Sequence, residues 1–396
     1  MRRALIIGGG IGGLAAAVAL QRVGVSVTVF EKEPAIAEVG AGLSIWSNAM
    51  LALRRIGLES AALQHGSIIE RVRSVNPSNV ELAVTDFAAL GERATAPSIC
   101  IHRADLQRLL HDAVTASSLS AVETGRECVG FFDASATVVA MFKDGSREEG
   151  DLLIGADGIH SVIRKSLFGH EVPRFAGYFA WRGVAHEAGF DLPAGEALMM
   201  LSRGAHAGAF HCGTDRIYWF LTCNASPGAA AGSPCEARAA IMSQIDNLQV
   251  DFRALVDATE SDAILRNDVI DRPPRRSWGR GRLTLLGDAI HATTPNLGQG
   301  ACQALEDAVL LADAISRDTS TEHGLRAYED QRRARANDVI TQSWRLGKLL
   351  QTTNPIKVWL RDTLSSTALG QKSTDKLFTR LLCTELPSLK PSTASV

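Results

Sequence analysis

Residues 4–31 read ALIIGGGIGGLAAAVALQRVGVSVTVFE, and this stretch decides how the chain begins to fold. Residues 4–7 are an apolar run typical of a short buried strand, and a run of glycines follows. The alanine-rich segment that comes next predicts a helix, and residues 25–30 predict a second strand that ends at Glu31. Gly8, Gly10 and Gly13 place the pattern G-x-G-x-x-G between the first strand and the helix.

Each glycine of this pattern has a physical role in holding a dinucleotide. Gly8 permits the tight turn, Gly10 lets the backbone approach a pyrophosphate, and Gly13 lets the helix pack on the strand. The N-terminus of the helix then faces the phosphates, and Glu31 is placed to accept hydrogen bonds from a ribose diol. Because a carboxylate there would repel a ribose 2′-phosphate, the stretch predicts a site for NAD or FAD rather than NADP.

The composition excludes several classes of protein. With 396 residues, 46% of them hydrophobic and 21% charged, the chain resembles an ordinary globular protein of two modest domains or one large one. The net charge of −2 argues against nucleic acid and anionic membranes as general partners. Seven scattered cysteines without a C-x-x-C pair argue against a zinc site and a disulfide framework. We therefore expect a cytoplasmic protein with no metal site and no membrane span.

A second glycine-rich stretch, GDAIHATTPNLGQG at residues 287–300, joins a strand-like run to a helix-like run. Asp288 places a carboxylate at the end of the strand, and the free N–H groups at the start of the helix point into the loop. An anionic or electron-rich ring in this loop would be stabilised. The alternative is an ordinary strand–turn–helix connection in which Asp288 only caps the helix.

Three further segments carry candidate binding groups. Arg103 comes directly before a predicted helix, where a guanidinium could clamp a phosphate, although it could equally be a surface arginine. Asp157 and Gly158 end another buried strand and again place a carboxylate beside an accessible backbone. The glycine-rich residues 38–48 could lie against a flat ring, or could be an ordinary connection.

The middle of the chain differs in character, because residues 175–260 contain strand-like runs separated by turns of small residues. We read it as a sheet laid on the first domain as a separate layer. The fold class is therefore α/β, with a Rossmann-like domain, an inserted β-sheet substrate domain and a C-terminal helical segment. We assign residues 1–72, 98–174 and 265–396 to the first domain and its helices, and residues 73–97 and 175–264 to the sheet domain.

Three motifs in this order resemble the class A flavoprotein monooxygenases of the para-hydroxybenzoate hydroxylase type. They are GGGIGGL with Glu31, DLLIGADGIHSVIR, and GRLTLLGDAIHATTPNLGQGACQALEDA. The resemblance covers nearly the whole chain, and the middle sheet matches in outline. It implies that FAD is bound by Gly8, Gly10, Gly12, Gly13, Glu31, Arg103, Asp157, Gly158, Asp288, Pro295, Gly298, Gly300 and Ala301.

The resemblance also implies the reaction. NADH or NADPH, as a transient co-substrate, would reduce FAD, and oxygen would add to give a flavin C(4a)-hydroperoxide. Its distal oxygen would pass to an electron-rich carbon of a small aromatic or heteroaromatic substrate, such as a hydroxylated benzoate or pyridine carboxylate. The protein would supply orientation, electrostatics and a dry pocket.

The sequence indicates the residues that contact the substrate less clearly than those that bind the cofactor. Pro295, Arg182, His211 and Tyr218 are the candidate catalytic residues, with Arg182 a possible partner for a substrate carboxylate. Arg182 could instead be an exposed strand arginine, and His211 a structural histidine. Urate-hydroxylating relatives use an arginine at about the position of His206, which makes urate doubtful.

Two rival functions stay open. The same flavin chemistry could hydroxylate or epoxidise a larger secondary metabolite or antibiotic. The protein could also be a flavin reductase or a regulatory flavin-binding protein that does not oxygenate. As partners we expect only the small-molecule substrate and O2, with a monomeric or homodimeric chain.

Overall fold

The computed structural model describes residues 2–36, 40–186, 189–228, 234–245 and 252–390. At its centre is a parallel sheet of five strands in the order β18-β12-β1-β2-β8. The strands are β1 (Arg3–Ile7), β2 (Ser26–Phe30), β8 (Ser120–Glu123), β12 (Leu152–Gly155) and β18 (Leu283–Leu285). Because all five strands are parallel, their carboxyl ends meet at one edge, where ligands bind in folds of this kind. The Rossmann-like α/β arrangement predicted from the first strand, glycines and helix is confirmed.

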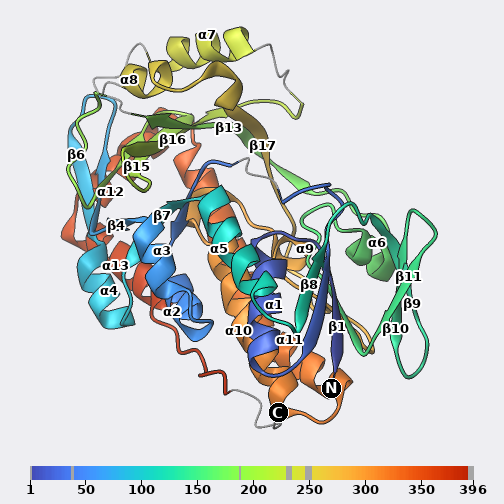
Figure 1. The fold of residues 1–396 in the computed structure, drawn as a ribbon. Coiled ribbons are helices and arrows are strands. Elements are labelled where there is room, and N and C mark those ends of the chain that lie inside the picture. Colours follow the sequence, from blue (N-terminus) through green and yellow to red (C-terminus); the bar gives the residue numbers. More distant parts are fainter. Residues whose placement is uncertain (1, 37–39, 187–188, 229–233, 246–251, 391–396) are drawn as a thin grey trace.

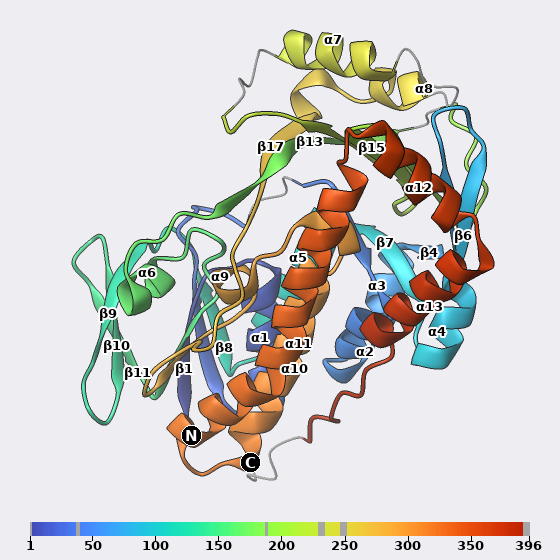
Figure 2. The same cartoon turned by 180° about the vertical axis from the view of Figure 1, so that it is seen from behind.

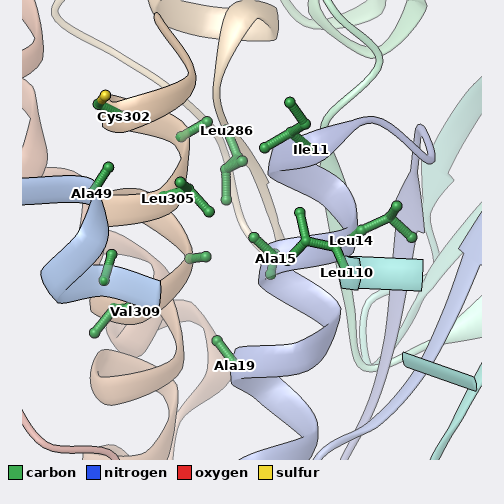
Figure 3. Close-up of a cluster of buried hydrophobic side chains, with 14 of the residues drawn as sticks. Ile11, Leu14, Ala15, Ala19, Ala49, Leu110, Leu286, Cys302, Leu305 and Val309 are labelled. Carbon is green, nitrogen blue, oxygen red and sulfur yellow. The ribbon is translucent and has the colours of Figure 1, made fainter. Parts of the chain in front are cut away.

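Long helices pack against this sheet and against one another (Figure 1). They are α1 (Ile11–Arg22), α5 (Arg103–Thr115), α10 (Gly300–Arg317) and α11 (Thr321–Leu350). Figure 3 shows Ala15 and Leu14 of α1 in the apolar core shared with Leu305 of α10. A Cβ atom at Gly12 would lie 2.8 Å from Leu286 Cδ2 and 3.2 Å from Ala304 Cβ. Gly12 therefore allows α1 and α10 to approach closely.

Two smaller units flank the parallel sheet: an antiparallel meander, and a three-stranded antiparallel sheet with its helices. The meander consists of β9 (Cys128–Asp133), β10 (Val138–Phe142) and β11 (Arg147–Gly150), with α6 (Val162–Phe168) against β9. A three-stranded sheet in the order β3-β7-β4 lies beside α2, α3 and α4. Its elements are β3 (Gly42–Ile45), α2 (Ser47–Arg55), α3 (Glu59–His65), β4 (Ser67–Ile69), α4 (Phe87–Ala94) and β7 (Ser98–His102).

The predicted middle sheet is a seven-stranded layer in the order β17-β13-β16-β15-β14-β5-β6. Its strands are β5 (Arg71–Val75), β6 (Glu81–Asp86), β13 (Arg174–His186), β14 (Glu196–Leu201), β15 (Ala205–His211), β16 (Arg216–Asn224) and β17 (Leu265–Asp271). Helices α7 (Pro234–Ile245) and α8 (Phe252–Asp257) cover its outer side, and the other side faces the parallel-sheet domain (Figure 1). We expected this unit to end at residue 264, but β17 extends it along the edge of β13. The division into two domains itself stays a prediction.

The C-terminal part is helical, as expected. Helix α11 crosses the back of the molecule, and α12 (Pro355–Ser365) and α13 (Ala368–Leu382) follow it beside β6 and α4 (Figure 2). Among the described residues, no helix is long and apolar enough to cross a membrane.

A buried ionic network ties these helices to the loops that follow the strands. Arg332 of α11 is fully buried and donates hydrogen bonds to Glu306 Oε2 and Asp307 Oδ1 of α10, both at 2.6 Å. Asp307 Oδ2 also lies 2.5 Å from His291 Nε2 and accepts from the Gly287 N–H at 3.0 Å. Burial opposes ionisation of Asp307, but His291 and Arg332 lower its pKa to about 2. The carboxylate therefore stays charged and holds the loop after β18 from behind.

Replacing Arg332 should destabilise the protein strongly, because the Arg332→Met variant leaves two buried carboxylates without their shared cation. We expect the free energy of unfolding to fall by about 3–5 kcal/mol, measured by urea denaturation of the FAD-free protein. The matched control is the neighbouring Arg333→Met, whose pair with Asp330 is at the surface and contributes about 1 kcal/mol or less. Equal stability of the two variants would contradict the role of the network.

Candidate active site

The glycine loop before α1 has the geometry of a phosphate-binding turn. Gly8 has φ +111°, and a Cβ atom there would lie 2.4 Å from the Ala156 carbonyl oxygen. A Cβ atom at Gly13 would lie 2.0 Å from the Gly8 oxygen, whereas one at Gly10 would have no neighbour within 4 Å. Helix α1 begins after Gly10 without a side-chain cap, so its first N–H groups face this open space. Gly8 and Gly13 thus serve packing, and Gly10 leaves room for a ligand.

Glu31 lies at the end of β2, beside this loop. Its Oε2 accepts a hydrogen bond from the Gly9 N–H at 2.7 Å, and its Oε1 accepts from the Glu33 N–H at 3.0 Å. Each carboxylate oxygen keeps lone-pair capacity for the hydroxyls of a ribose. Gln107 of α5, which the sequence did not indicate as a site residue, donates from Nε2 to the Gly9 oxygen at 3.0 Å. Its signal was a polar residue on the same helical face as the buried Leu106 and Leu110.

Asp157 and Gly158 follow β12 at the same edge of the sheet. Asp157 Oδ2 accepts from the N–H groups of Val162 at 2.7 Å and Ile163 at 3.2 Å, and so caps α6. Its Oδ1 is buried without a hydrogen-bond partner among the described residues, and burial raises the pKa of this carboxyl group. Gly158 has φ +76° and open space where a Cβ would be. The pair therefore offers an acceptor and bare backbone to a ligand.

Asp288 is the first residue of α9 (Asp288–His291), directly after β18. Its side chain is exposed although Gly287 and Ala289 are buried. Burial nevertheless raises its pKa, while the charges of His291 and Arg103 oppose this shift. Arg103, exposed at the first turn of α5, is close enough to act on the same carboxylate.

The loop that begins at Pro295 is held from two sides. Trp46, just before α2, donates from Nε1 to the Leu297 oxygen at 3.0 Å, and Tyr178 of β13 donates to Asn296 Oδ1 at 2.7 Å. Gly298 has φ +63°, and a Cβ there would lie 2.5 Å from Trp46 Nε1. The loop forms a short 3-10 turn, η2 (Pro295–Leu297). The described part of the 38–48 segment, which excludes residues 38 and 39, therefore contributes Trp46 as a support.

Helix α10 starts at the end of this loop with Gly300 and Ala301. Its N-cap residue Gln299 makes no side-chain capping bond, and the first helical backbone bond runs from Gln303 N–H to the Gln299 oxygen. The N–H groups of Gly300 and Ala301 therefore have no partner within the helix. The positive end of an 18-residue helix is directed at the loop, as the sequence predicted.

Strand register settles which side of the seven-stranded sheet faces the loops. Tyr218 and Phe220 of β16 pack toward the main core, whereas Trp219 packs toward α7 and α8. Arg182 lies directly opposite Phe220 across the β13–β16 pair and so shares its side. A Cβ atom at Gly42 of β3 would lie 2.4 Å from Tyr218 Cβ, which shows how closely this side meets the β3-β7-β4 sheet.

The structure corrects our expectation for His211. It pairs with Ile217, on the Trp219 side of the sheet, and its Nε2 lies 2.8 Å from the Leu192 oxygen. His211 is thus a structural histidine that faces away from Tyr218 and Arg182. Strand alternation was visible in the sequence, but which side meets the other domain is fixed by tertiary packing.

His206 lies on the loop-facing side and is a neutral group. It is 3% exposed, and its Nδ1 lies 2.7 Å from Thr222 Oγ1 and 3.1 Å from Gln351 Nε2. Burial, together with the charge of Arg361, lowers its pKa to about 4. The imidazole is therefore uncharged at neutral pH, so this position presents no cation.

Comparison with known proteins identifies the class to which this fold and site belong. Residues 2–343 match the family model described as FAD binding domain. The chain belongs to this family, and it is a class A FAD-dependent monooxygenase that binds FAD. The open space at Gly10 and Gly158, the unpaired Asp157 Oδ1 and the uncapped start of α10 fit such a cofactor.

Two relatives and one solved structure resemble the chain over most of its length. The chain is 38% identical over 364 residues to aurachin C monooxygenase/isomerase of Stigmatella aurantiaca, covering 91% of this chain and 92% of that protein. It is 33% identical to the zeaxanthin epoxidase of Oryza sativa, covering 89% of this chain but only 56% of that longer protein. The structure of HpxO of Klebsiella pneumoniae, complexed with FAD and uric acid, superposes with a TM-score of 0.87 at 27% identity over 96% of each chain. These relatives disfavour a flavin protein that does not oxygenate.

Two glycine variants should separate packing from cofactor binding. Gly10→Ala should leave thermal stability unchanged but weaken FAD binding at least about tenfold, because the methyl group projects into the open space at the α1 N-terminus. Gly13→Ala should lower the unfolding temperature of the FAD-free protein, because of the 2.0 Å approach to the Gly8 oxygen. The measurements are FAD titration of the apoprotein and thermal unfolding. Wild-type FAD affinity in Gly10→Ala would contradict the assigned site.

Proposed function

We propose that this protein uses NADH or NADPH and O2 to hydroxylate a small aromatic or heteroaromatic compound. The compound would be held between the loop-facing side of the seven-stranded sheet and the loop that begins at Pro295. Tyr178, which bridges β13 to Asn296, supports this placement because it fixes the two surfaces relative to each other. A structural neighbour that is complexed with the heterocycle uric acid supports the substrate class.

The cofactor would be held by groups that follow the ends of several strands. Gly10 and Glu31 would contact its adenosine diphosphate half in the turn that Gly8 and Gly13 shape, with Arg103 on the pyrophosphate and Asp288 on the ribityl chain. Bound and reduced FAD supplies the activation of O2 and the delivery of one oxygen atom to the substrate. The N–H groups at the start of α10 would stabilise negative charge on the ring, and Asp157 with Gly158 would contact FAD and the nicotinamide nucleotide.

The substrate proposal rests on the incomplete hydrogen bonding of the Arg182 guanidinium. Its Nη2 donates to Asn267 Oδ1 at 2.6 Å, yet its Nε is buried without a hydrogen-bond partner among the described residues. A buried guanidinium N–H without a partner costs free energy, which a carboxylate or phenolate oxygen of a substrate would recover. The adjacent Phe220 offers a ring face to the same substrate. Burial raises the pKa of Tyr218, so its hydroxyl stays protonated and can donate a hydrogen bond.

A second candidate substrate is a larger secondary metabolite, hydroxylated or epoxidised by the same cofactor. The observation that favours it is the 38% identity to aurachin C monooxygenase/isomerase over nearly the full length of both proteins. The neutral state of His206 also favours a less charged compound than a cationic residue would.

The reaction is tested by oxygen uptake of the FAD-loaded protein with NADH or NADPH, across phenolic acids, hydroxypyridines, purines and polyketides. We expect one compound class to accelerate nicotinamide oxidation and to gain one oxygen by mass. If no compound accelerates nicotinamide oxidation, that result would contradict hydroxylation of a small aromatic substrate.

Once a substrate is found, Arg182→Met should raise its KM about tenfold or more, a loss of roughly 1.5–3 kcal/mol for a hydrogen bond to a charged group. FAD content should not change, since Arg182 lies on the sheet. The control is Arg203→Met, an exposed arginine at the β14–β15 turn of the same sheet. Equal KM values for wild type and Arg182→Met would place Arg182 outside the pocket.

A further inference from the structure

Helix α12 has its apolar residues on the outside of the protein. Ile356 is 72% exposed and Trp359 65% exposed, and Leu360 and Leu364 are 46% and 49% exposed. The spacing of 356, 359, 360 and 364 puts these four side chains on one face of the helix. We call this set the α12 apolar face. A surface helix in water has the opposite arrangement, with its apolar stripe turned to the core.

The side of α12 that faces the body is polar. Arg361 is 4% exposed, and its Nη1 donates to the carbonyl oxygens of Ser202 at 3.1 Å and Leu350 at 3.3 Å. Its Nε donates to Asp362 Oδ1 at 2.7 Å. The helix is thus attached by a buried guanidinium, and it does not use its large apolar residues for attachment. These contacts fix the direction in which the α12 apolar face points.

Other exposed apolar residues lie on the elements next to α12. Leu369, at the start of α13, is 75% exposed, and Val84 of β6, a strand that α12 contacts, is 40% exposed. Both views place α12 at the periphery of the molecule (Figures 1 and 2). Contiguous apolar patches of this kind mark interaction sites, whereas single exposed apolar residues need no explanation.

The chain segment that carries α12 is basic, whereas the whole protein has a small negative net charge. Residues 343–380 contain seven lysines and arginines against two aspartates, although the complete chain has a net charge of −2. Lys357, Lys372 and Lys376 are exposed, while Asp362 and Asp375 are paired with Arg361 and Arg93. An amphipathic helix with tryptophan and leucine on one face and flanking lysines is typical of a helix that lies in a lipid–water interface.

We propose that α12 docks this protein on an anionic lipid surface, with Trp359 and its apolar neighbours inserted below the headgroups. A second copy of the chain is the less favourable occupant. A two-fold interface would bring the same basic segment of both copies together, and these like charges would repel each other. Docking requires no membrane span and does not depend on the identity of the substrate.

The test is flotation of the FAD-loaded protein with vesicles of phosphatidylcholine alone or with 30% phosphatidylglycerol, at low salt. We expect binding to the anionic vesicles and much weaker binding to the neutral ones. Trp359→Ser should reduce the partition coefficient about tenfold or more, because a tryptophan side chain contributes much of the buried apolar area. Trp359→Phe should largely restore binding.

The control is Val172→Ser, which removes an apolar side chain that is 76% exposed outside α12 and should leave binding unchanged. FAD content and circular dichroism of each variant show whether the fold is intact. No binding to anionic vesicles, or equal binding of wild type and Trp359→Ser, would overturn the proposal. A concentration-dependent dimer that Trp359→Ser abolishes, without any lipid binding, would assign the α12 apolar face to a second copy instead.

Discussion

The buried guanidinium of Arg332 is the interaction on which the arrangement of the site depends. Its bonds to Glu306 and Asp307 join α11 to α10, and the same two carboxylates hold the neighbouring segments. Asp307 binds His291 and the Gly287 N–H, and Glu306 accepts from Asn48 Nδ2 of α2 at 2.6 Å. The loop that carries Asp288 and the helix that begins at Gly300 are therefore fixed from behind by Arg332, with Arg335 as a second cation on Glu306. A buried ion pair of this kind is costly to break and specifies one geometry.

Because the loop after β18 and the start of α10 are held in place, the polar groups on the open side of the site keep a fixed arrangement. The ends of β1, β12 and β18 present bare backbone at Gly10, an unpaired Asp157 oxygen and the Asp288 carboxylate in one region. The seven-stranded sheet closes the region with Phe220, Tyr218 and Arg182. The proposed function takes its cofactor groups from loops after parallel strands and its substrate groups from a separate layer. Under that proposal a change of substrate requires changes in the sheet alone, which accords with one fold serving relatives of different names.

Local sequence patterns predicted the turns and strand ends at the proposed cofactor site, because a tight turn, a close backbone approach and a strand end each demand particular residues. Gly8, Gly13 and Gly298 are examples, since a Cβ atom at each would meet another atom within 2.5 Å. The residues on the substrate side of the proposed site could not be predicted from local patterns in the same way. His211 and Tyr218 are both plausible in sequence, and only packing of the sheet puts them on opposite sides. Arg332, Trp46 and Gln107 act through contacts far apart in the chain, which no local pattern reveals. The outward-facing apolar residues of α12 are likewise recognised only from the exposure of its side chains in the structure.

The most direct test of this account is the flavin content of the Asp288→Ala variant after gel filtration. We expect a yellow wild-type protein with about one FAD per chain and a nearly colourless variant with an unchanged fold. Asp112→Ala, which removes an exposed carboxylate from α5, should remain yellow. A fully loaded Asp288→Ala variant would contradict the placement of the cofactor at the end of β18, and with it the site described for this protein.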